Sequence, residues 1–101
     1  MDPHIMVAGT TEPQDFVLTD DGTAINGTGI TVALDWRGSD PDGPPAVAWL
    51  VAASGTVRVT NTGSMSVRTY KFRFKLTDGG GAISYIPNLS SEPNTWKVVD
   101  V

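Results

Sequence analysis

Residues 68–76 read Arg-Thr-Tyr-Lys-Phe-Arg-Phe-Lys-Leu and carry the clearest pattern in the chain. From the third of these residues onward, every second side chain is large and mostly apolar: Tyr70, Phe72, Phe74 and Leu76. The positions between them are basic: Lys71, Arg73 and Lys75. Because successive side chains of a strand point to opposite faces of its sheet, this alternation predicts a β-strand with one core face and one basic face.

Similar, shorter segments lie on both sides of this strand. Residues 30–37 alternate in the same way and place Trp36 in phase with three aliphatic residues. Further strands are expected at residues 15–19, 46–53, 56–60, 82–86 and 95–101. Turn-forming Asp-Gly, Asn-Gly and Ser-Gly pairs separate these segments, and Ser54-Gly55 predicts a two-residue hairpin turn. About seven or eight short strands with such turns predict an all-β fold, a single antiparallel, immunoglobulin-like β-sandwich.

The chain has 101 residues, a length that suits one domain. We divide it into residues 1–14, an N-terminal arm or edge strand, and residues 15–101, the β-sandwich domain. The first residues lack the basic start and the long apolar run of a secretory signal. No segment approaches the ~20 apolar residues that span a bilayer, so no membrane partner is expected.

Charge and cysteine content narrow the function classes. The formal net charge of −4 and the pI of about 4.6 argue against nucleic acid or an anionic membrane as the main partner. The chain has no cysteine, so it offers neither a disulfide framework nor a thiolate metal site. These properties fit a protein that matures in a reducing cytosol.

Residues that could carry catalysis or bind a metal are scarce. His4 is the single histidine and no Gly-x-Ser-x-Gly motif is present, so we interpret His4 as an ordinary surface residue and expect no enzyme activity. Asp40-Pro41-Asp42-Gly43 partly resembles a calcium loop, with Asp20 or Asp78 as further oxygen ligands after folding. The bidentate Glu of the full loop is absent, so turn formation is the preferred role, and we expect neither a metal nor a cofactor.

Aromatic residues leave a second binding class open. Trp49, Trp96 or Tyr85 could stack on a sugar ring, with loop carboxylates binding its hydroxyl groups. Tryptophans in a short chain are more often core residues, and Trp36 is assigned to the core because it lies in phase with Ile30 and its neighbours.

The basic face of the central strand has two interpretations. Lys71, Arg73 and Lys75 place three like charges at about 7 Å spacing, an arrangement that needs acidic or polar neighbours. These side chains could pair with Asp35 or Asp100 on adjacent strands. Alternatively, they form a contact patch for an acidic partner protein, and they are our candidate partner-contact residues.

Two stretches resemble the N-terminal domain of phage baseplate upper proteins. Residues 16–34 show its opening strand, Asp-Gly turn, Asn, Thr-Gly step and alternating strand. Residues 69–79, followed by Ile-Pro-Asn at 86–88, resemble its later strand, Asp-Gly turn and approach to the last strand. Two residues depart from the family pattern: Gly27 stands at a usually apolar position, and Arg68 stands where a glycine commonly precedes the Thr-Tyr pair.

The resemblance implies a non-enzymatic virion structural protein, made and assembled in the host cytoplasm. Such an adaptor connects fibres or receptor-binding proteins to the tail or baseplate, in many copies within a symmetric assembly. Its partners would be other tail, baseplate or fibre proteins. Two alternatives remain open: a sugar-binding or host-surface-binding module, and a capsid decoration protein with the same fold.

Overall fold

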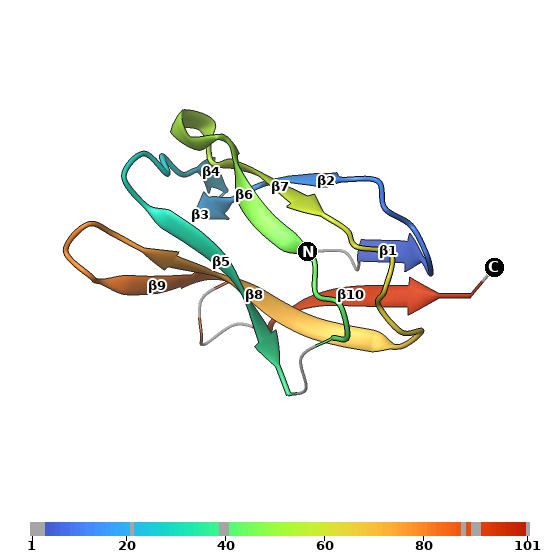
Figure 1. The fold of residues 1–101 in the computed structure, drawn as a ribbon. Coiled ribbons are helices and arrows are strands. Elements are labelled where there is room, and N and C mark those ends of the chain that lie inside the picture. The colour runs from blue at the N-terminus through green and yellow to red at the C-terminus, as the bar shows by residue number, and fades with distance from the viewer. Residues whose placement is uncertain (1–3, 21, 39–40, 88, 90–91, 101) are drawn as a thin grey trace.

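The computed structural model describes residues 4–20, 22–38, 41–87, 89 and 92–100. In this part of the chain ten strands form three sheets, with one short 3-10 helix, η1, at Ala52–Ser54 (Figure 1). The strands are β1 His4–Val7, β2 Gln14–Val17, β3 Thr19–Asp20, β4 Thr23–Ala24, β5 Thr31–Arg37, β6 Ala46–Val51, β7 Thr56–Thr60, β8 Thr69–Thr77, β9 Ile83–Ile86 and β10 Asn94–Val99.

The predicted central strand, β8, organises the larger sheet. Strand β5 pairs antiparallel with one edge of β8, and β10 and β9 share the other edge, so Phe72 lies opposite both Trp36 and Asn94. The sheet order is β1-β10-β8-β5, with β9 attached to β8. Strand β8 therefore has strand neighbours on both edges over most of its length, while its alternating side chains divide between a core face and an outer face.

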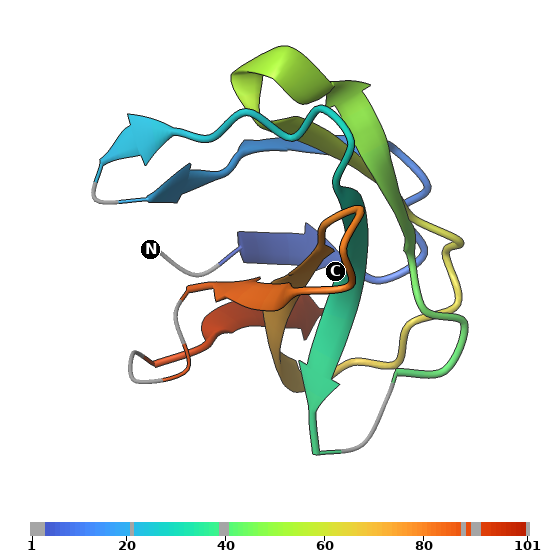
Figure 2. The same cartoon turned by 90° about the vertical axis from the view of Figure 1, so that its left-hand side faces the viewer.

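The second sheet has the order β2-β7-β6 and lies over the first, as Figure 2 shows. On its outer face, a bidentate ion pair joins β7 to β2, with the Arg58 Nε atom 2.8 Å from Asp15 Oδ1. The small β3–β4 hairpin continues from this layer and projects above β9. Two facing, mainly antiparallel sheets confirm the predicted all-β sandwich class. The described strands outnumber the predicted ones because short pairs such as β3–β4 count separately.

The core lies between the two layers. Phe72, Phe74 and Trp96 are 0% exposed, and the ring centroids of Phe72 and Trp96 are 5.7 Å apart. Trp36 packs on the same group with its ring centroid 5.5 Å from that of Phe72, as predicted. Burial of this aromatic cluster is the main source of stability that we identify, since the chain has no disulfide.

Two local predictions need adjustment. Residues 52–55 connect β6 to β7 through η1, whereas a two-residue Ser54-Gly55 turn was predicted. Gly55 adopts φ +69° after η1, a conformation that glycine reaches without a Cβ penalty. At the N-terminus, His4–Val7 forms an edge strand parallel to β10, which is the edge-strand alternative predicted for residues 1–14. Among the described residues, no helix has the length and apolar character to cross a membrane.

Candidate functional site

The basic face of β8 is less exposed than the sequence suggests. Lys71 is exposed and Lys75 is half-buried, but Arg73 is only 2% exposed. The prediction that Arg73 contacts a partner is therefore wrong for the folded chain, because other parts of the protein cover its guanidinium group. Asp35 on β5 lies directly opposite Arg73 in the β5–β8 register. This is the arrangement expected if the basic side chains of β8 pair with acidic residues on adjacent strands. Lys71 and Lys75 stay candidates for a partner contact.

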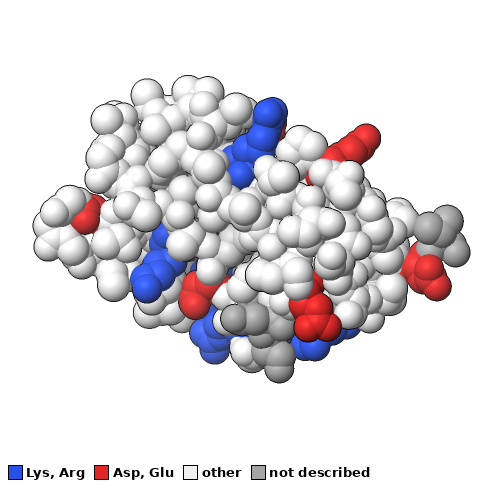
Figure 3. Space-filling model, in the orientation of Figure 1, with Lys and Arg blue, Asp and Glu red and all other residues white. Residues whose placement is uncertain are grey.

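One region of the surface drawn in Figure 3 shows no charged side chains. In Figure 3, the upper left of the molecule, over η1, β4 and the adjoining part of β6, shows neither acidic nor basic atoms. Leu50 and Val51, which end β6 there, are 45% and 50% exposed. Isolated exposed apolar residues are common in soluble proteins, so this surface alone identifies no partner.

His4 is not the ordinary surface residue that was predicted. Its ring is half-buried, with centroids 4.4 Å from that of Trp96 and 5.5 Å from that of Phe16, so it joins β1 to both layers. The Nε2 atom is buried, and no described residue offers it a hydrogen bond. Loss of hydration on burial lowers the pKa of His4 below its usual value of 6.5. The His4 ring therefore contributes to the packing of β1 against Trp96 and Phe16.

The buried His4 ring should make stability depend on pH. Unfolded His4 binds a proton near pH 6.5, whereas the folded ring binds it less tightly, so stability is complete above that pH and falls as the pH drops through and below it. Urea unfolding midpoints at pH 7.5 and pH 5.5 should show the fall in the natural protein and a smaller one in His4→Leu. Equal falls in both proteins would assign the effect to other groups.

The aromatic residues proposed for sugar stacking are largely engaged in the fold. Trp96 is 0% exposed and presents no face to a ligand. Trp49 is half-buried, and its indole N–H donates a 2.7 Å hydrogen bond to the Ile30 carbonyl oxygen. Tyr85 is half-buried on β9. Trp96 is therefore excluded as a stacking platform, and the hydrogen bond of Trp49 fixes its ring against the sheet.

One acidic residue proposed as a calcium ligand instead forms hydrogen bonds within its own turn. Asp78 Oδ1 accepts hydrogen bonds from the backbone N–H groups of Gly80 and Ala82, which is the turn-forming role preferred from the sequence. Asp40 and Asp21 lie outside the described residues, and Asp42 is exposed. In the described part of the chain, no three acidic or histidine side chains come close enough together to hold a metal ion.

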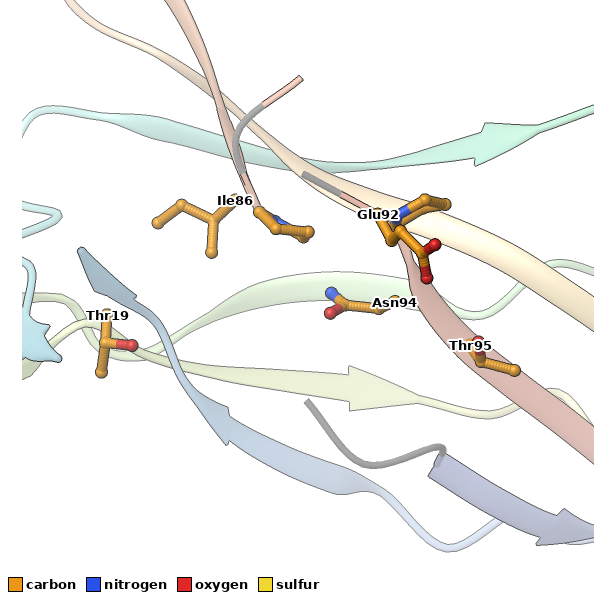
Figure 4. A pocket seen from close by; sticks show the side chains of 7 residues that line it. Thr19, Ile86, Glu92, Asn94 and Thr95 are labelled. Atoms are coloured by element: carbon orange, nitrogen blue, oxygen red, sulfur yellow. The ribbon is translucent and has the colours of Figure 1, made fainter. Parts of the chain in front are cut away.

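A cleft opens between the layers beneath the β3–β4 hairpin. Its larger part, about 510 Å³, lies between β3, the end of β9 and the start of β10 (Figure 4). The described residues that line it are Thr19, Ile86, Pro87, Glu92, Pro93, Asn94 and Thr95. An adjoining hollow of about 330 Å³ shares Thr19, Ile86 and Pro87 and extends toward Asp20, Ile25 and Tyr85. Both volumes lie in the range of about 300–1,000 Å³ that is usual for ligand pockets.

Asn94 is the unusual residue of this cleft. It shares the inner face of β10 with Trp96 and Val98 and is 5% exposed, but its Nδ2 atom has no hydrogen-bond partner among the residues that the structure describes. Figure 4 shows its amide directed into the space between Ile86 and Thr19. An unpaired buried donor costs about 1–3 kcal/mol, so its retention needs an explanation.

Sequence reasoning missed Asn94 because the last strand was expected to begin at Thr95, one residue too late. The signal was present: Asn94 precedes Trp96 by two positions, so on a strand both side chains share a face. A polar residue in phase with buried apolar ones marks either a satisfied core group or a site.

Comparisons with known proteins give no evidence about the function of this chain. No family model, curated protein or solved structure matches the chain. The resemblance to phage baseplate upper proteins thus stays a prediction that rests on residues 16–34, 69–79 and 86–88.

Proposed function

We propose that this chain is a non-enzymatic phage virion protein, an adaptor that joins fibres or receptor-binding proteins to the tail or baseplate. The proposal rests on the resemblance of residues 16–34, 69–79 and 86–88 to the attachment domain of baseplate upper proteins. In the fold these stretches contain β3, β4 and β8 and parts of β2 and β5, so they include strands of both layers and the small hairpin. The resemblance therefore concerns the framework of the sandwich and not a single loop.

The observation that carries the adaptor role is the outer edge of β1. Strand β1 pairs with β10 on one side, and no other described strand pairs with it. Its sequence His-Ile-Met-Val has no charged residue, and Ile5 and Val7 are 62% and 43% exposed. Natural proteins usually protect such edges with charge, proline or a bulge, because free N–H and C=O groups recruit further strands. An unprotected edge suits strand addition by a neighbouring protein.

Lys71 and Lys75 support the same role. They belong to the outer face of β8, with Arg37 opposite Lys71 in the adjacent strand β5. Lys71 and Arg37 are both exposed, so a basic pair lies on an otherwise acidic protein. An acidic surface on a neighbouring subunit would complement this basic pair. Such complementary charges fix how the two proteins are oriented and change the affinity only modestly.

The proposal predicts that purified virions contain this protein in many copies. Quantitative mass spectrometry of the particles should give a fixed, integral ratio to the tail proteins, because an adaptor occupies every symmetric position. Labelled particles viewed by electron microscopy should carry the label at the tail. Absence of the protein from virions would overturn the proposal, and a label on the head would instead identify a decoration protein.

A matched pair of variants tests the role of β1 in the same particles. Ile5→Lys places a charge on the free edge and should reduce incorporation, because charged side chains oppose edge-to-edge pairing. Val51→Lys changes a residue of similar exposure at the end of β6 and should leave incorporation unchanged. Equal incorporation of both variants would exclude β1 as the contact.

A further inference from the structure

The cleft beneath the β3–β4 hairpin has the properties of a peptide site. Its walls come from strands of both layers: β3 on one side and β9 with the start of β10 on the other. Strand β9 pairs with β8 along one edge, and no described strand pairs with its other edge. An extended segment entering here would meet unpaired backbone groups as well as the cleft residues.

Asn94 defines what the occupant must supply. Its Nδ2 atom is a donor that meets no acceptor in the described part of the chain, on a side chain that is 5% exposed, and Figure 4 shows the amide directed into the cleft. The matching group is a carbonyl oxygen. A peptide backbone offers one at every residue, so it can place a carbonyl at Asn94 while its side chains contact the walls.

The remaining walls select for an extended, basic segment. Ile86, Pro87 and Pro93 give the larger part apolar surface, and Thr19 and Thr95 add hydroxyl groups that can donate or accept. The charged residues among the described lining are Glu92 in the larger part and Asp20 in the adjoining hollow. Both are acidic, so they favour a lysine or arginine on the occupant and disfavour an acidic segment.

We propose that this cleft binds an extended peptide segment of a partner protein, with a main-chain carbonyl accepting from Asn94 Nδ2 and a basic side chain beside Glu92. The inference concerns the isolated domain and stands apart from the virion assignment. It explains why a polar residue is retained in phase with Trp96 and Val98 at the open end of the sandwich.

Selection from a displayed library of random decapeptides on the immobilised protein tests the proposal. Enriched sequences should carry lysine or arginine at a recurring position. A synthetic peptide of the most enriched sequence should then shift the side-chain amide resonances of Asn94 in ¹H–¹⁵N spectra of the full chain, together with the backbone amides of Thr19 and Ile86. These resonances report on the cleft directly, without any assay of virion assembly.

Variants separate this site from other modes of binding. Asn94→Asp replaces the donor by an acceptor of equal size and should weaken the selected peptide about threefold to tenfold, as loss of one hydrogen bond implies. Asn94→Leu should weaken binding of the selected peptide to a similar extent. Because leucine suits a buried position, this variant shows whether the loss seen with Asn94→Asp comes from the missing donor or from misfolding. Glu92→Gln should remove most of the preference for the basic peptide over the same peptide with glutamate, about twofold to fivefold.

Three results would overturn the proposal. The first is failure of the library to enrich any sequence on a protein whose spectrum shows it to be folded. The second is binding that both Asn94 variants leave unchanged, because the peptide would then lie elsewhere. The third is a shift of the Asn94 resonances by simple sugars but not by the selected peptides, which would assign the cleft to a glycan.

Discussion

Replacing Phe72 by alanine should lower the free energy of unfolding by about 3–5 kcal/mol. Phe72 is 0% exposed at the middle of β8, between Trp36 on β5 and Asn94 on β10. Its ring centroid lies 5.4 Å from that of Phe74 and 5.7 Å from that of Trp96, so removal of the ring opens a cavity in the aromatic cluster. Small domains have only about 5–15 kcal/mol of stability in total, so this loss is a large share.

Urea unfolding followed by tryptophan fluorescence measures this loss as a lower midpoint with an unchanged slope. Lys71→Ala is the matched control, because Lys71 is the adjacent residue on the exposed face of the same strand. Its effect should stay within about 0.5 kcal/mol. A Phe72→Ala protein that unfolds at the natural midpoint would contradict the assignment of this face of β8 to the core.

The inner face of β8 could be predicted because its pattern is local. Tyr70, Phe72 and Leu76 are large, alternate with basic residues and need a second layer to cover them. The burial of the Arg73 side chain could not be predicted from the same alternation. One strand indicates which side chains share a face, but what lies over the outer face depends on segments distant in the sequence.

The N-terminal strand shows a similar limit. The apolar run at residues 5–8 is short enough for a free arm, and its parallel pairing with β10 joins residues about 90 positions apart. No local signal specifies that pairing. His4 was assigned to the surface for the same reason, since its burial follows from the contact of β1 with Trp96 and Phe16.

The polar residue of the candidate cleft was missed because the last strand was predicted to begin one residue too late. With the last strand predicted to begin at Thr95, Asn94 lay outside every predicted strand, and a polar residue outside a strand needs no explanation. Strand β10 begins at Asn94, which turns the same amide into an inward-facing donor on a strand of the core. The walls of the cleft also include Thr19 and Ile86, which only the packing of the two layers brings together.

The packing around Gly27 gives a physical reason for a glycine at this position. A Cβ atom built on Gly27 would lie 2.4 Å from Cζ2 and 2.5 Å from Cη2 of Trp49, so the indole fills the space that a side chain would need. The Gly27 N–H donates to the Ala52 carbonyl oxygen at 2.7 Å, and its own carbonyl accepts from the Ile30 N–H at 2.9 Å. Backbone and indole are both held in place, so neither can easily give way.

Replacing Gly27 by alanine should therefore destabilise the domain by about 1–3 kcal/mol, the usual cost of overpacking. Gly79→Ala is the control, because no atom lies within 4 Å of a Cβ there, and its φ is not positive. Its effect should stay within about 0.5 kcal/mol in the same urea titration.

Trp49→Phe tests the cause of this loss. Phenylalanine lacks the outer indole atoms that meet the added methyl group, although it also gives up the hydrogen bond to Ile30. If the steric account is right, Gly27→Ala costs less in the Trp49→Phe protein than in the natural one. We expect a coupling energy of about 0.5–3 kcal/mol between the two sites, the range for residues in contact. Additive effects would show that the cost of alanine arises from the backbone of the turn and not from the indole.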